Sequence, residues 1–239
     1  MITAFSFTEP GDRTRNEDAV ATATRENVAC FVLCDGLGGH SGGAEASRLA
    51  CDTVTAAFLA SGEPSLSLRM DVAILAAQDA VSQMAPPRGK TTLCCLMLDE
   101  SRVSAVWVGD SRIYLFRNGA VVGHTLDHSV PQHLVRMGKI TDRDIRHHED
   151  RNRLLRALGD DWDNPEYEHW SLPEAALPGD AFLLCSDGFW EWVEDEEMLS
   201  CLLSADGPET WAMRMQDAAL KKGCGHSMDN YSAITVWVQ

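Results

Sequence analysis

The sequence predicts an α+β fold in which antiparallel strands and helices form separate layers. Short apolar runs of strand length, rich in Val, Leu, Cys and aromatic residues, recur along the chain. Longer stretches with helical periodicity lie between them in pairs, which favours such layers over an alternating βαβ winding. The Asn118-Gly119 dipeptide between two short runs is a strong hairpin signal, so at least part of the sheet is antiparallel.

Each element is expected from its own stretch of sequence. We predict strands at the apolar runs 28–34, 92–98, 102–108, 112–117, 181–186 and 232–238. Helical patterns cover 43–60, 67–84, 130–138, 195–203 and 208–222. The segment 138–153 is polar and highly charged, which indicates an exposed loop or a short helix beside the core. Because we find no internal repeat and no linker rich in Pro, Gly or Ser, we expect one domain over residues 1–239.

Composition excludes several classes of partner. The formal net charge of −16 repels nucleic-acid phosphates and anionic membranes, so we expect neither as a partner. No apolar run approaches the roughly 18 residues that span a bilayer, and the first residues lack the pattern of a signal peptide. The eight cysteines form no CxxC pair and several lie in apolar runs, so we interpret them as reduced core thiols rather than zinc ligands. We therefore expect a cytoplasmic protein.

Carboxylates follow or precede several of the predicted strands. Asp-Gly or Gly-Asp pairs come directly after the runs 28–34, 102–108 and 181–186, and two further acidic sites precede strand-like runs. One Asp-Gly after a strand is normally only a turn, but its recurrence suggests a shared rim of the sheet. The residues concerned are Glu17, Asp18, Asp35, Asp110, Asp187 and Asp229.

Carboxylates gathered at one rim would suit a site for hard cations. Their mutual repulsion raises their pKa values and destabilises the fold unless cations are bound. Oxygen ligands without Cys and with few His favour Mg²⁺ or Mn²⁺ over Zn²⁺. Two such ions can activate a water for in-line attack on phosphorus. Arg13 is a candidate to hold the phosphate, because a guanidinium binds phosphate oxygens in a fork. From the pattern alone, simple turns remain an alternative.

Seven motifs in order resemble those of the metal-dependent serine/threonine protein phosphatases, the PPM or type 2C family. They start with the segment 11–18 (GDRTRNED) and the segment 35–40 (DGLGGH) with its small residues to 47. The segments 109–114, 125–129 and 152–159 match central motifs, and Ser186-Asp187-Gly188 and Asp229-Asn230 complete the set. Each motif is short, but together they extend over more than two hundred residues, and the chain is similar to compact bacterial members.

The resemblance implies a fold and a pair of central ions. The fold would be a four-layer α-β-β-α sandwich with two central antiparallel sheets, each flanked by a pair of helices. Asp35 would bridge the two ions, and the carbonyl of Gly36 and the carboxylate of Glu17 would bind one of them. Asp187 and Asp229 would hold the other ion.

Further roles follow from the same resemblance. Asp18 would orient metal-bound waters, and Asp110 together with Asp187 would hold a third, weaker ion. A competing interpretation is that Asp110 only caps the turn that follows it. Arg13 would bind the substrate phosphate, and His40 would be the general acid that protonates the leaving oxygen of Ser or Thr.

Three features outside these motifs leave alternatives open. The family normally has a Gly-Thr-Thr or Gly-Ser-Thr segment where this chain has 89–92 (GKTT), which puts the local packing around Lys90 in doubt. The segment 130–153 resembles a flap that faces the substrate, although its charged residues could equally be a solvated surface. These are Lys139, Arg143, Arg146, His147 and His148. Trp190 and Trp192 could line a partner groove, but core packing is the favoured interpretation.

The predicted function is hydrolysis of phosphoserine and phosphothreonine in proteins, by attack of a water or hydroxide that bridges two Mg²⁺ or Mn²⁺ ions. The partners would be phosphorylated proteins, made by a Ser/Thr kinase, and we expect a monomer. One alternative is a catalytically silent relative that binds a phosphoprotein as a regulatory module, but the chain retains the expected carboxylates and Arg13. A two-metal nuclease would share the acidic site but conflicts with the charge of −16.

Overall fold

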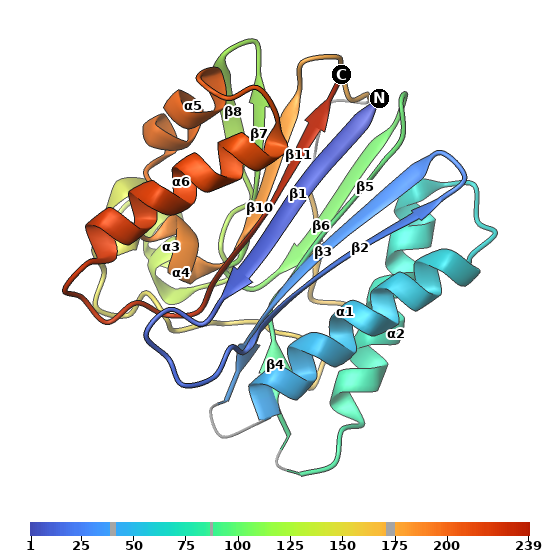
Figure 1. The fold of residues 1–239 in the computed structure, drawn as a ribbon. Coiled ribbons are helices and arrows are strands. Elements are labelled where there is room, and N and C mark those ends of the chain that lie inside the picture. Colours follow the sequence, from blue (N-terminus) through green and yellow to red (C-terminus); the bar gives the residue numbers. More distant parts are fainter. Residues whose placement is uncertain (39–41, 87, 171–174) are drawn as a thin grey trace.

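A computed structural model describes residues 1–38, 42–86, 88–170 and 175–239 (Figure 1). Two antiparallel sheets face each other, and helices cover the outer side of each sheet (Figure 1). This confirms the four-layer α-β-β-α sandwich that the sequence predicts. None of the helices in the described ranges is both long and apolar enough to cross a lipid bilayer.

The first sheet contains the two ends of the chain. Its strands lie in the order β1 (Ile2–Glu9), β11 (Tyr231–Val238), β10 (Ala181–Cys185), β7 (Arg112–Arg117) and β8 (Ala120–His124). The hairpin between β7 and β8 turns at Asn118 and Gly119, where φ is 53° and 71°. Both residue types tolerate this left-handed conformation, so the predicted hairpin is confirmed.

The second sheet carries the early and central parts of the chain. Its order is β2 (Asp18–Arg25), β3 (Val28–Leu37), β5 (Leu93–Leu98), β6 (Val103–Val108) and β9 (Glu168–His169), and the short β4 (Lys90–Thr91) pairs with the end of β3. All of β5 and most of β3 are buried, because these central strands are covered on both faces. Strands covered in this way are continuously apolar, which is why their sequence signal is strong.

Helices cover the outer faces of both sheets. α1 (Gly42–Ala60) and α2 (Leu66–Ser82) pack on the second sheet, while α5 (Asp195–Leu203) and α6 (Pro208–Gly223) cover the first (Figure 1). A further one-turn helix, α4 (Asp187–Trp190), follows β10 directly. Apolar side chains fill the three interfaces between the four layers, and the central one includes Phe31, Leu96, Phe182 and Ile234.

The predicted elements agree with the structure within a few residues, but four strands, β1, β2 and the two-residue β4 and β9, were given no predicted range. β1 alternates between half-buried and exposed residues, and β2 is only partly buried, so neither forms a continuous apolar run. Their pairing with β11 and β3 explains why they are strands despite this weaker signal.

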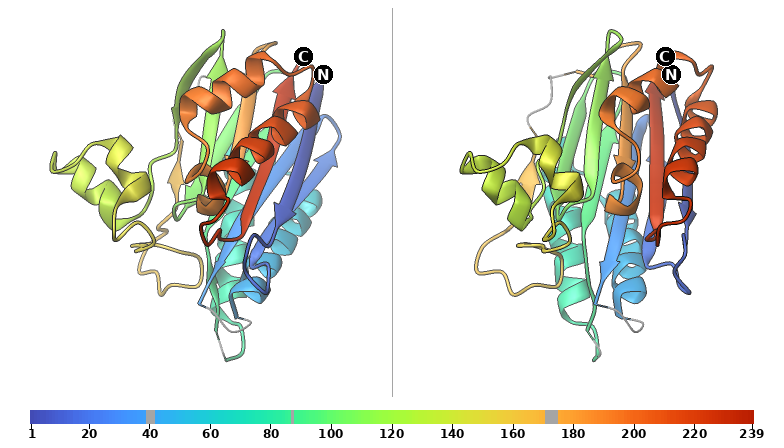
Figure 2. Two further views of the ribbon diagram at one scale, coloured as in Figure 1. Left: turned by 60° about the vertical axis from the view of Figure 1, so that its left-hand side comes forward. Right: turned by 90° about the vertical axis from the view of Figure 1, so that its left-hand side faces the viewer.

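The segment 130–153 projects from the body of the molecule (Figure 2, left). It contains α3 (Val130–Arg136) and a 3₁₀ helix, η1 (Asp142–His147). We call this segment the flap. It is not entirely a solvated surface, because Ile145 and Arg146 within it are buried. Arg146 was grouped in the sequence with residues that could face a substrate, but its side chain packs against the body instead.

Candidate metal centre

One pocket of about 350 Å³ contains most of the residues that the sequence assigned to a site. It opens where the ends of the two sheets meet. The predicted residues that line it are Arg13, Glu17, Asp35, Gly36, Asp110, Asp187 and Asp229. Asp18 is buried and hydrogen-bonds with strand-end residues of the opposite sheet, whereas His40, the predicted general acid, lies outside the described residues.

Asp18 connects the two sheets at the pocket. It opens β2 and pairs directly with Asp35 of β3. Its Oδ2 accepts hydrogen bonds from Ser186 Oγ at 2.8 Å and from Ser232 Oγ at 2.7 Å, at the ends of β10 and β11. Its Oδ1 is buried and has no hydrogen-bond partner among the described residues. A buried carboxylate oxygen without a partner is costly, and an ion or an ordered water would satisfy it.

Two threonines hold the backbone of Asp35. The Asp35 amide donates to Thr92 Oγ1 at 2.9 Å, and the Asp35 carbonyl accepts from Thr91 Oγ1 and from the Thr92 amide, each at 2.8 Å. Lys90, the departure from the family pattern, is exposed and forms an ion pair with Asp160. The packing around the segment 89–92 therefore accommodates the lysine at the surface, while both threonines position Asp35.

Glycines allow the acidic strand ends to approach one another. A Cβ atom on Gly36 would lie 2.4 Å from the Gly43 backbone and 2.6 Å from the Glu17 carbonyl oxygen. A Cβ atom on Gly188 would lie 2.1 Å from the Asn230 carbonyl oxygen. Real Cβ atoms do not come so close to backbone atoms, so any larger residue at either position would force the neighbouring backbone to shift.

Asn230 organises the loop that precedes β2. Its Oδ1 accepts from the Glu17 amide at 2.8 Å, and its Nδ2 donates to the carbonyls of Pro10 and Arg15, each at 2.9 Å. The sequence places Asn230 and Ser186 in motifs without giving either a role, and Ser232 was not singled out. The available signal was a polar side chain at the end of an otherwise apolar strand.

The carboxyl groups in and behind the pocket repel one another. The pKa of Asp18 is raised to about 7 and that of Asp187 to about 6, mainly by burial and also by the charge of a neighbouring carboxylate, Asp187 and Asp229 respectively. Burial, followed by the charge of neighbours that include Asp187, also raises the pKa values of Asp35 and Asp110 well above the usual range. Bound divalent cations would reverse this effect, because they stabilise the ionised form.

Within the part of the chain that the structure describes, the pocket side chains do not by themselves form a closed set of metal ligands. No three His, Cys, Asp or Glu side chains converge as a ready set of ligands within the described ranges. Instead, Arg13 Nη2 lies 2.8 Å from Asp229 Oδ2, and these side chains are 54% and 36% exposed. Because both side chains are partly exposed, Arg13 and Asp229 can move apart. The all-oxygen donor set, the raised pKa values and the unpaired Oδ1 of Asp18 together fit Mg²⁺ or Mn²⁺.

A sequence model described as Protein phosphatase 2C matches residues 11–218. The chain belongs to this family. It is 35% identical over 218 residues to the serine/threonine protein phosphatase PstP of Mycobacterium tuberculosis, a match that covers 88% of this chain but 40% of that protein. It is 34% identical to the serine/threonine phosphatase stp of Listeria welshimeri, covering 80% of this chain and 79% of that one.

A solved phosphatase 2C structure has the same fold and contains metal. The catalytic domain of the serine threonine protein phosphatase PstP in complex with two manganese ions has a TM-score of 0.83 and 29% identity, and the match covers 100% of this chain and 99% of that one. Membership of the family and the four-layer fold therefore agree with the resemblance seen in the sequence.

Proposed function

We propose that this chain is a Mg²⁺- or Mn²⁺-dependent phosphatase that hydrolyses phosphoserine and phosphothreonine in proteins. The observation that carries the proposal is the convergence of strand-end carboxylates from both sheets on one pocket that also contains Arg13. The phosphatase 2C relatives, named as serine/threonine phosphatases, support the same substrate class.

The carboxylates of the pocket would bind two metal ions. Asp35, Gly36 and Glu17 would hold one ion, Asp187 and Asp229 the other, with Asp35 shared between them. The ions, when bound, supply Lewis acidity that lowers the pKa of water and neutralises charge on the phosphate.

Other residues would orient the substrate and the water. Asp18, fixed by Ser186 and Ser232, would hold a water through its unpaired Oδ1. Arg13 would break its ion pair with Asp229 and bind the phosphate oxygens through its guanidinium. We further propose that Asp110 helps to hold a third, weaker ion and that His40 protonates the leaving oxygen.

The direct test is release of phosphate from phosphoserine and phosphothreonine peptides, and from p-nitrophenyl phosphate, in Mn²⁺ and in EDTA. We expect turnover only with the metal, and loss of turnover in Asp187→Asn. Asp163→Asn is a matched control, since Asp163 is exposed and does not line the pocket. A folded wild-type protein that binds phosphopeptides but releases no phosphate in Mn²⁺ would favour the silent regulatory relative.

A further inference from the structure

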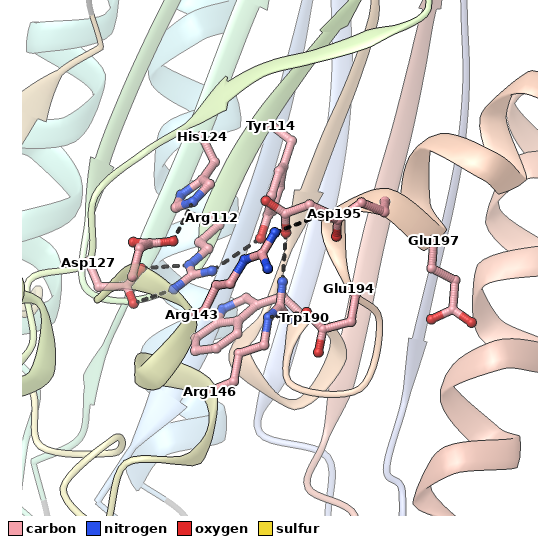
Figure 3. Close-up of polar contacts among 12 residues, drawn as sticks. Arg112, Tyr114, His124, Asp127, Arg143, Arg146, Trp190, Glu194, Asp195 and Glu197 are labelled. Carbon is pink, nitrogen blue, oxygen red and sulfur yellow. Dashed lines mark hydrogen bonds and ion pairs between the residues drawn. The ribbon is translucent and has the colours of Figure 1, made fainter. Parts of the chain in front are cut away.

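Two arginines of η1 contact the start of α5 in very different surroundings (Figure 3). Arg143 Nη2 lies 3.1 Å from Glu196 Oε1, and these side chains are 87% and 75% exposed. Arg146 Nη2 lies 2.6 Å from Asp195 Oδ1, its Nε lies 3.2 Å from Glu194 Oε2, and its side chain is only 6% exposed. The acidic partners Glu194 and Asp195 are 48% and 32% exposed, so only the arginine end of these pairs is buried. Exposed ion pairs contribute little, whereas partly buried pairs are screened less by solvent. Arg146 is therefore the stronger of these two attachments of the flap.

Arg146 also contacts Trp190, which is buried at 2% exposure. The Arg146 guanidinium carbon lies 5.6 Å from the centre of the indole, and that of Arg112 lies 3.8 Å away. Figure 3 shows Trp190 between the two arginines. Arg112 is itself fixed, because its Nε and Nη2 each donate to Asp127 at 2.8 Å in a buried pair. The indole thus has one rigid neighbour in the body and one neighbour in the flap.

Trp190 connects these contacts to the carboxylates of the pocket. Its Nε1 donates to the carbonyl oxygen of Asp110 at 2.9 Å. It is also the last residue of α4, the one-turn helix that begins at Asp187. A displacement of the indole would therefore move the backbone of Asp110 and the helix that carries Asp187. Both of these residues line the same pocket.

We propose that Arg146 and Trp190 are positioning residues that couple the position of the flap against α5 to the distance between Asp110 and Asp187. When Arg146 holds the flap against α5, the indole keeps the Asp110 carbonyl in place, and the two carboxylates face the same part of the pocket. Loosening of the flap would separate them and weaken their hold on a cation. This inference rests on the proposed function, in which these carboxylates bind Mg²⁺ or Mn²⁺.

The test compares Arg146→Ala with Glu196→Gln, which breaks only the exposed attachment nearby. We expect Arg146→Ala to weaken the weakest Mn²⁺ step in a calorimetric titration, and to lower kcat for p-nitrophenyl phosphate, by about 2- to 30-fold, the range found for networks that couple two sites. Glu196→Gln should stay within about twofold of the wild type, as an exposed pair contributes little. A purely structural role of Arg146 would lower the melting temperature and leave Mn²⁺ binding by the folded protein unchanged, which would overturn the proposal.

A second variant, Trp190→Phe, keeps the proposal testable if Arg146→Ala fails to fold. Trp190→Phe keeps an aromatic ring beside both arginines but removes the N–H that donates to Asp110. We expect weaker Mn²⁺ binding here too, and in the double variant with Arg146→Ala the two effects should not add, because both act through one connection. Normal Mn²⁺ binding by Trp190→Phe, or full additivity, would contradict the proposal. Failure of the proposed function itself would look different, since the wild type would then neither bind Mn²⁺ nor turn over.

Discussion

The two sheets contribute to the pocket in different ways. On the second sheet, Asp18 and Asp35 are direct partners in the β2–β3 ladder, and hydroxyl groups fix the side chain of one and the backbone of the other. On the first sheet, Asp187 opens a one-turn helix, and Asp229 precedes β11 and pairs with the half-exposed Arg13. We call Asp18 and Asp35 the rigid side of the pocket, because hydrogen bonds hold them. We call Asp229 and Arg13 the open side, because their side chains are 36% and 54% exposed. The comparison suggests that the rigid side sets the position of an ion and the open side admits the phosphate.

Asp35→Asn should have the largest effect, because Asp35 belongs to the rigid side and would be shared by both ions. Changes to residues that merely support a ligand cost about 10–100-fold in metal affinity or activity, and a shared ligand should cost more. Initial rates with Mn²⁺ and a calorimetric titration measure this. If Asp35→Asn keeps wild-type affinity and turnover, the bridging role is wrong.

Arg13→Ala should affect the open side without disturbing the rigid one. Losing a charge-assisted contact to phosphate should cost roughly 1.5–3 kcal/mol, seen mainly as a higher KM for small phosphoesters. Steady-state kinetics over a range of p-nitrophenyl phosphate concentrations measure it. An unchanged kcat/KM would mean that Arg13 serves only its ion pair with Asp229.

Asp229→Asn should weaken metal binding less than Asp35→Asn, because Asp229 is partly exposed and would hold only one ion. We expect a loss of about tenfold in Mn²⁺ affinity, the lower end of the range for changes around a metal site. The titration should be run beside Asp35→Asn in the same buffer. Equal losses in the two variants would remove the distinction between the rigid and the open side.

A further expected effect is on stability as a function of pH, and it should disappear with metal. The folded-state pKa values of Asp18 and Asp187, about 7 and about 6, lie above the unfolded value of 3.8. The folded state then binds more protons between these values, so in EDTA stability should fall as pH rises from about 4 to 7. Each kcal/mol corresponds to about 2–4 °C in melting temperature for a chain of this size. A melting temperature in EDTA that rises over this window would contradict the crowding of carboxyl groups.

Much of the fold could be predicted from the sequence because its central strands are buried on both faces. The runs that became β3, β5 and β10 are continuously apolar for this reason. β1 was not predicted, and β2 was indicated only as a strand-like run after Asp18, because both lie at the edges of their sheets and carry a weaker pattern. The carboxylates were found because they stand at strand ends, where the change from apolar to acidic is visible.

The supporting contacts of the site could not be predicted, because they join distant parts of the chain. Arg146 meets Asp195 across 49 residues, and its burial is invisible in a segment that is charged throughout. Asn230 binds the Arg15 carbonyl across 215 residues. Such pairings depend on how the sheets stack, which no local pattern encodes.

The hydrogen bonds of Asp18 have a consequence for how the protein unfolds. They join residues 168 and 214 positions apart, so this corner of the pocket exists only when both sheets are assembled. Ions bound there would recognise the native state and not the unfolded chain. Mass action would then stabilise the fold by about 2.7 kcal/mol at an ion concentration one hundred times the dissociation constant. Bound metal would hold the two sheets together, so both sheets should unfold in a single transition in its presence.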